Sequence, residues 1–136
     1  MKATILLLLA GLSIAQAAEP KGTLTLACKG TITNSADQKG PFSMSIKLDF
    51  TVRTVQGFGT PGLIDIPVRI TGINDVTVVF GGSGPVFGTS IMTINGSIDR
   101  VTGDLEATDH LMDAKTRKTL DSTTYALQCK PTQRMF

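Results

Sequence analysis

The sequence of 136 residues contains no tryptophan, one tyrosine and one histidine. Aromatic platforms for sugars, which two-carboxylate glycosidases use, are therefore scarce. A large charge of one sign is also missing, since 13 basic and 11 acidic side chains leave a formal net charge of +2. Nucleic-acid binders normally carry a larger positive excess to displace counterions. We therefore expect no nucleic acid among the partners. We also expect no cofactor.

Nucleophilic and metal catalysis have few residues to draw on. A serine triad would need His110 as its base, and no Gly-x-Ser-x-Gly motif marks a nucleophile. Asp104, Glu106 and His110 share one predicted strand face, but they spread over about 20 Å, too far to chelate one ion. We expect no catalytic residue, no metal site and no enzymatic activity. The residues that could complete a triad are Ser90, Ser97, Ser122, Asp109, Asp113 and Asp121.

A hydrophobic run is present only at the N-terminus. After Met1 and Lys2, residues 5–14 form an apolar run of about ten residues, whereas about 20 are needed to cross a bilayer. Ala15-Gln16-Ala17 has the small-x-small pattern of a signal-peptidase site. We predict a cleaved signal peptide over 1–17 and a single domain over 18–136. The mature protein would be periplasmic or secreted from a bacterium and would have no membrane span.

The sequence contains only two cysteines, Cys28 and Cys129, one near each end of the predicted domain. Exported chains meet oxidising conditions, and one pair in such a domain indicates a disulfide. Each cysteine is in phase with apolar neighbours along a predicted strand, so both sulfur atoms are expected to point inward. The bond would hold the two ends of the chain side by side.

Apolar residues occupy every second position from Phe42 to Val52, a period typical of a strand with one buried face. The same pattern, with turn residues between runs, recurs along the chain, and no amphipathic helix is indicated. Asp99–Gly103 is predicted to be the tight turn of a hairpin. The other predicted strands include 24–28, 63–71, 76–81, 89–98, 104–111 and 125–129.

These strands predict an all-β fold, and we favour a small antiparallel barrel or barrel-like sandwich of about seven strands. In a closed barrel of seven strands the first and last lie parallel, and cysteines near their C-terminal ends would meet across the seam. A sandwich with both terminal strands in one sheet would allow the same bond. The pattern does not decide between barrel and sandwich.

Two glycine-rich segments, 57–62 and 81–88, are predicted to be loops. Neither has the Gly-Lys-Ser/Thr ending of a phosphate-binding loop. Phe58 and Phe87 lie beside glycines in these segments, so their rings are candidates for contact with a partner. The alternative is that both rings fold back onto the core. Lys115, Arg117 and Lys118 form a small positively charged turn. We interpret it as either a solvated turn or a binding patch.

The last third of the chain resembles small exported bacterial proteins with no assigned activity. The residues that carry this resemblance are Ile98-Asp99-Arg100-Val101-Thr102-Gly103 with Leu105-Glu106-Ala107, and Tyr125-x-Leu127-x-Cys129-Lys130-Pro131-x-x-Arg134-Met135-Phe136. A fainter similarity is to the small-barrel periplasmic lysozyme inhibitors, which carry a cysteine near each end. Those proteins have a Ser-Gly-x-x-aromatic loop that enters the lysozyme cleft. The nearest stretch here is Ser83-Gly84-Pro85-Val86-Phe87.

Three classes of function remain open. The first is an exported, non-enzymatic module that contacts an unknown protein or envelope component, with Phe58, Ser83 and Phe87 as candidate partner-binding residues. The second is a ligand-carrying barrel, and a protein like the periplasmic lysozyme inhibitors is a further alternative. The third is an enzyme. In the ligand-carrying barrel the interior would be lined by Phe42, Met44, Ile46 and Leu48.

Overall fold

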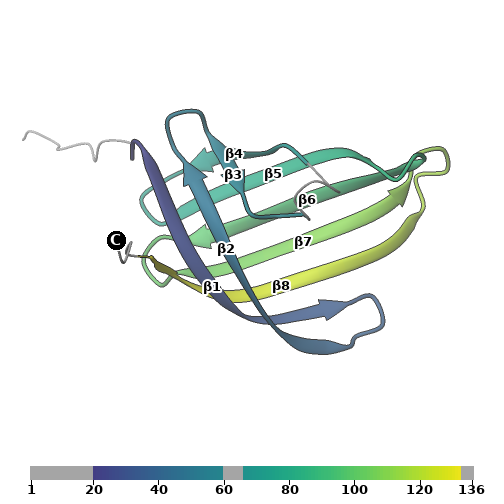
Figure 1. Cartoon of the computed structure of the whole chain (residues 1–136), viewed down its shortest axis with the longest axis horizontal. Helices are drawn as coiled ribbons and strands as arrows, with labels where there is room; N and C mark the ends of the chain where they lie inside the picture. Colours follow the sequence, from purple (N-terminus) through teal and green to yellow (C-terminus); the bar gives the residue numbers. More distant parts are fainter. Residues whose placement is uncertain (1–19, 60–65, 133–136) are drawn as a thin grey trace, which may run out of the picture.

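The computed structural model describes residues 20–59 and 66–132 of the chain. Eight strands in this part form a closed barrel, in which each strand pairs antiparallel with the next and the last returns to the first (Figure 1). The predicted small antiparallel barrel is confirmed, and the predicted signal peptide lies outside the described residues. The strands are β1 (Thr23–Asn34), β2 (Lys39–Asp49), β3 (Thr54–Gln56), β4 (Val68–Ile73), β5 (Thr77–Val86), β6 (Ser90–Asp99), β7 (Asp104–Asp113) and β8 (Thr119–Pro131).

The core lies inside the barrel because alternate residues of each strand point inward. In β2, Ile46 and Leu48 are buried, while Lys47 between them is exposed. A barrel of eight strands is just wide enough for side chains to fill its interior. The part of the chain that the structure describes has no helix long and apolar enough to cross a membrane. The most deeply buried large side chains are Phe80, Ile46, Leu48, Ile94, Leu105 and Val78.

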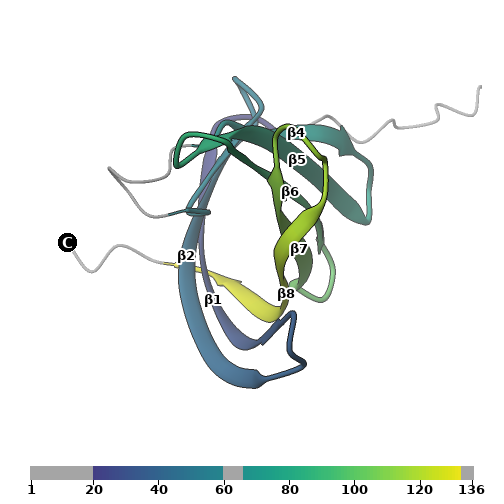
Figure 2. The ribbon, with the colours of Figure 1, turned by 90° about the vertical axis from the view of Figure 1, so that its right-hand side faces the viewer.

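The connections alternate between two ends of the barrel (Figure 1). One end, here called the disulfide end, carries the turns 50–53, 74–76 and 100–103, with the start of β1 and the end of β8. The opposite end, here called the tip end, carries the connections 35–38, 87–89 and 114–118. Figure 2 shows β1 and β2 on one side of the barrel, with β6 and β7 facing them on the other.

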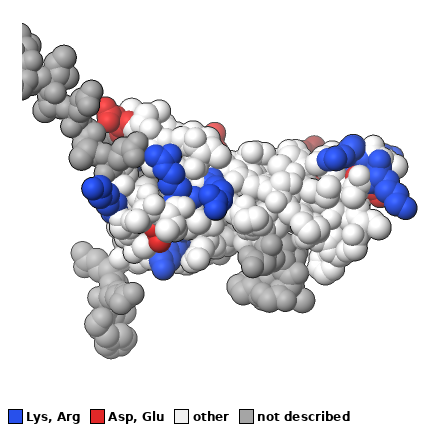
Figure 3. Space-filling model, turned by 90° about the horizontal axis from the view of Figure 1, so that it is seen from above, with Lys and Arg blue, Asp and Glu red and all other residues white. Residues whose placement is uncertain are grey.

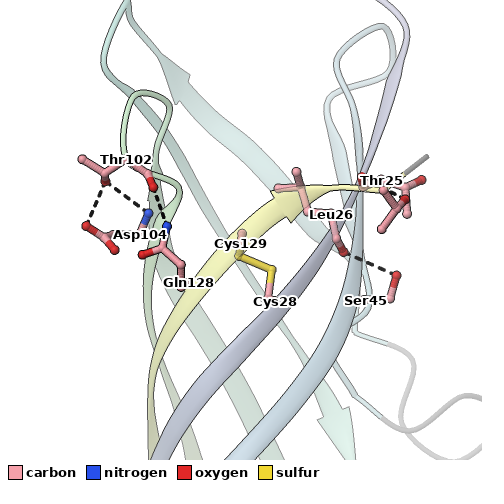
Figure 4. The surroundings of a disulfide bond; sticks show 9 residues. Thr25, Leu26, Cys28, Ser45, Thr102, Asp104, Gln128 and Cys129 are labelled. Carbon is pink, nitrogen blue, oxygen red and sulfur yellow. Dashed lines mark hydrogen bonds between the residues drawn. A yellow bond between two sulfur atoms is a disulfide. The ribbon is translucent and has the colours of Figure 1, made fainter.

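The predicted disulfide joins Cys28 on β1 to Cys129 on β8, directly across the seam of the barrel (Figure 4). The Cys129 N–H donates to the Gly103 carbonyl oxygen at 2.8 Å and therefore points toward β7. The two cysteines are thus a non-hydrogen-bonded pair of the β1–β8 ladder, the kind in which facing side chains are closest. Their Cα atoms are 4.0 Å apart.

The expectation that the first and last strands lie parallel was wrong, because β1 and β8 are antiparallel. A closed up-and-down barrel with an even number of strands brings its two terminal strands together antiparallel. The strand that the sequence did not predict is β3, which has only three residues and pairs with β2 and β4. Three residues are too few to give a readable alternation.

Several boundaries differ from those predicted: the strand predicted over 63–71 is observed as β4 from Val68, with 63–65 outside the described residues, and β1 and β8 are longer than 24–28 and 125–129. Two other differences have a local cause. The alternation continues to Val52, but β2 ends at Asp49, whose carboxylate accepts the N–H groups of Thr51 and Val52 and turns the chain. The segment predicted as a loop from Gly81 onward belongs to β5 as far as Val86. Glycine is needed within it, since a Cβ at residue 82 would lie 2.2 Å from the Pro67 carbonyl oxygen.

The hairpin predicted around Asp99–Gly103 is confirmed as the connection between β6 and β7. The Asp99 carboxylate accepts the N–H groups of Val101 and Thr102 at 2.7 and 2.9 Å. Gly103 has a φ of 81°, a backbone conformation that favours glycine. The local sequence therefore determines this turn, and β7 returns antiparallel to β6 as expected.

Candidate functional site

The structure places the two candidate aromatic residues differently. Phe58, after β3, is half-buried, and its ring centre lies 5.3 Å from that of Phe80 and 5.9 Å from that of Tyr125. Both neighbours point into the barrel, so the Phe58 ring folds back onto the core. Phe87, in the β5–β6 connection, is 74% exposed.

Phe58 belongs to a row of aromatic rings inside the barrel, which Phe42 extends by an edge-to-face contact with Tyr125 at 5.7 Å. The Tyr125 hydroxyl donates to the Asp109 carboxylate at 2.8 Å. Burial, together with this carboxylate, raises the pKa of Tyr125. Asp109 also accepts the backbone N–H of Thr123 at 3.2 Å. The Asp109 carboxylate therefore holds the Tyr125 ring in place among the core side chains.

The backbone at Phe87 is in the left-handed region, with a φ of 44°, and Gly88 follows with a φ of 75°. Glycine fills such a position easily because it has no Cβ, and asparagine or aspartate is tolerated because its short polar side chain can hydrogen-bond locally. For other residues the contact of Cβ with the backbone costs about 1–2 kcal/mol. The exposed ring does not recover this cost by packing in the described structure. Neither the turn nor the core therefore requires phenylalanine at residue 87.

The connection that holds Phe87 is joined to the neighbouring hairpin. The Ala114 N–H donates to the Thr89 carbonyl oxygen at 2.7 Å, and Ser90 pairs with Asp113 where β6 and β7 meet this end. The β7–β8 connection therefore lies beside Phe87. Figure 3 shows basic side chains at this end of the molecule, on the right, as well as others toward the opposite end. Those of the β7–β8 connection are the exposed Lys115, Arg117 and Lys118.

Leu120 adds a second apolar side chain to this end of the barrel. The β7–β8 register pairs Leu111 with Asp121 and Met112 with Thr119, so Leu120 is the extra residue of a bulge. Its side chain is 54% exposed. We call the surface formed by Phe87, Lys115, Arg117, Lys118 and Leu120 the tip cluster.

Two carboxylates near the tip cluster are engaged by the chain itself. Asp113 accepts the backbone N–H groups of Thr116 and Lys115, and these hydrogen bonds lower its pKa. Asp121 accepts the Ser35 hydroxyl at 2.6 Å. Asp113 therefore holds the β7–β8 turn in which the cations of the tip cluster lie.

Ser83, the third candidate residue, lies in β5 and not in a loop. Its side chain is exposed, and its hydroxyl lies 3.2 Å from that of Thr93 on β6. It therefore stands on the barrel wall and is not part of the tip cluster. The Ser83–Phe87 stretch is strand as far as Val86, and only Phe87 extends beyond it.

The residues weighed for catalysis do not converge. His110 pairs in register with Ser122, but Asp109 on the same strand faces the interior and holds Tyr125. Asp104 and Glu106 lie on the His110 side of β7, spread along it as the period of two requires. Within residues 20–59 and 66–132 there is no group of three or more His, Cys, Asp or Glu residues that could hold a metal ion.

One surface feature was not predicted from the sequence. A shallow depression of about 410 Å³ lies on the outer face of β6, β7 and β8, over two cross-strand rows of outward-facing residues. The signal that could have found it is the run of small and polar residues at alternate positions of three successive strands. Its outward side chains are those of Asn95, Ser97, Glu106, Thr108, Thr124 and Ala126.

Comparison with known proteins gives no functional assignment. No protein-family model matches the chain, and neither the curated proteins nor the solved structures give a significant match. The two resemblances noted from sequence therefore remain hypotheses. Function has to be inferred from the surface of the barrel itself.

Proposed function

We propose that this protein is an exported, non-enzymatic binding module that contacts a partner through the tip cluster. The observation that carries the proposal is the exposed ring of Phe87 on left-handed backbone. Bulky residues held in unfavourable backbone conformations concentrate at functional sites. Exposed aromatic and basic side chains are also the residues that most often anchor protein contacts.

Export is supported by the covalent chemistry of the barrel. A disulfide such as Cys28–Cys129 persists in oxidising compartments and is rare in the bacterial cytosol. The predicted signal peptide over 1–17 agrees with this. We therefore propose a periplasmic or secreted location, in which the partner is a protein or another component of the cell envelope.

The ligand-carrying barrel has less support. Ile46 and Leu48, which would line its cavity, are packed among other buried side chains, and Phe42 and Met44 pack against the same cluster. The Phe58 ring lies across the interior between Phe80 and Tyr125. A ligand of any size would have to displace these side chains.

Inhibition of lysozyme also has less support than the general binding function. The inhibitors that this chain resembles faintly present their Ser-Gly-x-x-aromatic stretch as a loop. Here Ser83 is held in a strand beside Thr93. Residual lysozyme activity measured with an excess of this protein tests the alternative directly, and full activity would remove it.

The proposed contact surface is tested by Phe87→Asn, which removes the ring and places a residue suited to left-handed backbone. Wild-type and variant proteins are immobilised and exposed to a bacterial envelope extract. We expect a component retained by the wild type and lost with the variant. As a matched control, Val101→Asn changes an exposed apolar residue of the disulfide end and should retain the component. Equal retention by wild type and Phe87→Asn would contradict the proposal.

The proposed location has its own test. The full chain is expressed in a bacterium, and the intact mass of the protein in the periplasmic fraction is measured. We expect a mass that lacks residues 1–17 and is two hydrogen atoms lower than that of the dithiol form. Recovery of the uncleaved chain in the cytosol would contradict export.

A further inference from the structure

The tip cluster has a composition that identifies its partner more closely. Phe87 and Leu120 expose apolar side chains at the same end of the barrel as the three exposed cations at residues 115, 117 and 118. Aromatic and apolar side chains enter the headgroup region of a bilayer, while lysine and arginine are attracted by acidic headgroups. We propose that the tip cluster docks peripherally on a membrane surface rich in acidic phospholipid. This inference rests on the proposed function.

The size of the surface favours a bilayer over a protein partner. A specific protein interface usually buries about 800 Å² on each side. The apolar part of the tip cluster is two side chains at the end of a hairpin pair. Shallow insertion of one ring, assisted by diffuse electrostatic attraction, needs no such area and no complementary shape. The long and flexible lysine side chains suit a charged surface without fixed acceptor positions.

The opposite end of the barrel is the competing surface. Val52, Val76 and Val101 are exposed there, one on each of its three turns. In each turn, however, an Asp or Asn side chain accepts the backbone N–H groups, as Asp49, Asn74 and Asp99 do. Charges of both signs lie beside these valines, since Asp49 and Asp99 share their turns with Arg53 and Arg100.

The tip end differs from the disulfide end in how its cations are grouped and where its aromatic ring lies. Its three cations fall within four residues of one turn, whereas the cations of the disulfide end are spread over separate turns. It also carries a bulky ring on backbone that disfavours it, whereas the valine turns place their positive φ at other residues, such as Arg53 and Gly103. The grouping of its cations and the placement of the ring both favour the tip cluster.

The test is co-sedimentation of the mature, disulfide-bonded protein with vesicles of phosphatidylcholine alone or mixed with phosphatidylglycerol. We expect binding to the anionic vesicles only, weakening as salt is added. Lys115→Gln, Arg117→Gln and Lys118→Gln together should lower the partition coefficient about 100-fold, since each cation contributes about five-fold. Phe87→Asn should lower it about ten-fold or more.

Two control variants keep the test specific. Lys29→Gln, Lys47→Gln and Lys130→Gln remove the same charge from exposed positions on the wall formed by β1, β2 and β8. Val52→Thr, Val76→Thr and Val101→Thr remove the apolar side chains of the competing end. Both triple variants should bind as the wild type does. Loss of binding with either control, or equal binding to neutral vesicles, would overturn the inference.

The vesicle test and the envelope-extract test separate the two proposals. No vesicle binding, together with a protein or polymer retained through Phe87, would overturn the membrane inference and leave the binding module supported. No vesicle binding and no retention that depends on Phe87 would overturn both. An acidic polymer retained in place of lipid would likewise contradict the membrane surface as the partner.

Discussion

The Ala114 N–H donates to the Thr89 carbonyl oxygen at 2.7 Å, which joins the β7–β8 connection to the β5–β6 connection. This bond makes one surface from residues that are about 30 positions apart in the chain. It holds the connection that carries Phe87 against the connection that carries the cations at 115, 117 and 118. Without such a bond, two neighbouring hairpin tips could move apart, and neither alone carries both the ring and the charges.

Replacing Phe87 by asparagine is expected to stabilise the fold. Asparagine adopts left-handed backbone more easily than phenylalanine, so the free energy of unfolding should rise by about 1 kcal/mol. Urea unfolding of both proteins measures the difference. A loss of several kcal/mol would mean that the ring packs against the barrel, and the tip cluster would then lose its exposed aromatic residue.

The opposite effect is expected at Phe58, which packs against Phe80 and Tyr125. Phe58→Ala should lower the free energy of unfolding by about 2–4 kcal/mol, near the lower end for a core phenylalanine because the ring is only half-buried. Phe87→Ala in the same urea titration is the matched control, with an expected change within about 0.5 kcal/mol of zero. Equal losses from the two variants would be inconsistent with the different packing of the rings.

Removing the disulfide should destabilise the barrel strongly. Cys28 and Cys129 close a loop of 101 residues, and the chain-entropy relation gives about 4–5 kcal/mol for a loop of this size. Thermal melts with and without a dithiol, and of the Cys28→Ala and Cys129→Ala double variant, measure the effect. An unchanged melting temperature would show that the β1–β8 seam closes without help from the bond.

Stability is expected to fall in acid through the aspartates that hold turns. Hydrogen bonds from backbone N–H groups lower the pKa of Asp99 and Asp113 below the ordinary value of 3.8. A pKa that is lower in the folded state means that the unfolded chain binds protons first as pH falls. Their contribution is therefore complete above the unfolded pKa, which is close to that ordinary value, and is lost as pH falls through the folded pKa.

Urea midpoints between pH 5 and pH 2 measure this dependence. Asp99→Asn with Asp113→Asn should flatten the acid limb, because asparagine keeps an oxygen acceptor that does not titrate in this range. Asp75→Asn, in the exposed β4–β5 turn, serves as the control and should leave the acid limb as steep as in the wild type. A double variant with an unchanged acid limb would remove the two turn aspartates as its cause.

The sequence was sufficient to predict the class of fold because its signals are local. Alternation over β2, the cysteine phase and the Asp99–Gly103 turn each depend on a few neighbouring residues, and all are present in the structure. The short β3 has no such signal, because its three residues are too few to show a pattern. They form a strand by pairing with β2 and β4. Its omission also gave the wrong relative direction for the terminal strands.

The candidate site could be predicted only in part. Phe58 and Phe87 both lie beside glycines, and nothing local shows that one ring enters the barrel while the other is exposed. Their environments depend on the path of the chain after β3 and on the position of the β5–β6 connection. The proximity of the Phe87 connection to the basic turn also depends on the register of β6 and β7, which brings Thr89 and Ala114 together.

The most direct test of the tip cluster as a contact surface uses the absence of tryptophan from the chain. Phe87→Trp introduces a single indole, whose fluorescence reports its own surroundings. We predict emission typical of a water-exposed indole in buffer, and a shift to shorter wavelength when vesicles containing phosphatidylglycerol are added. Emission that is already typical of a buried indole in buffer, or unchanged by these vesicles, would contradict the account.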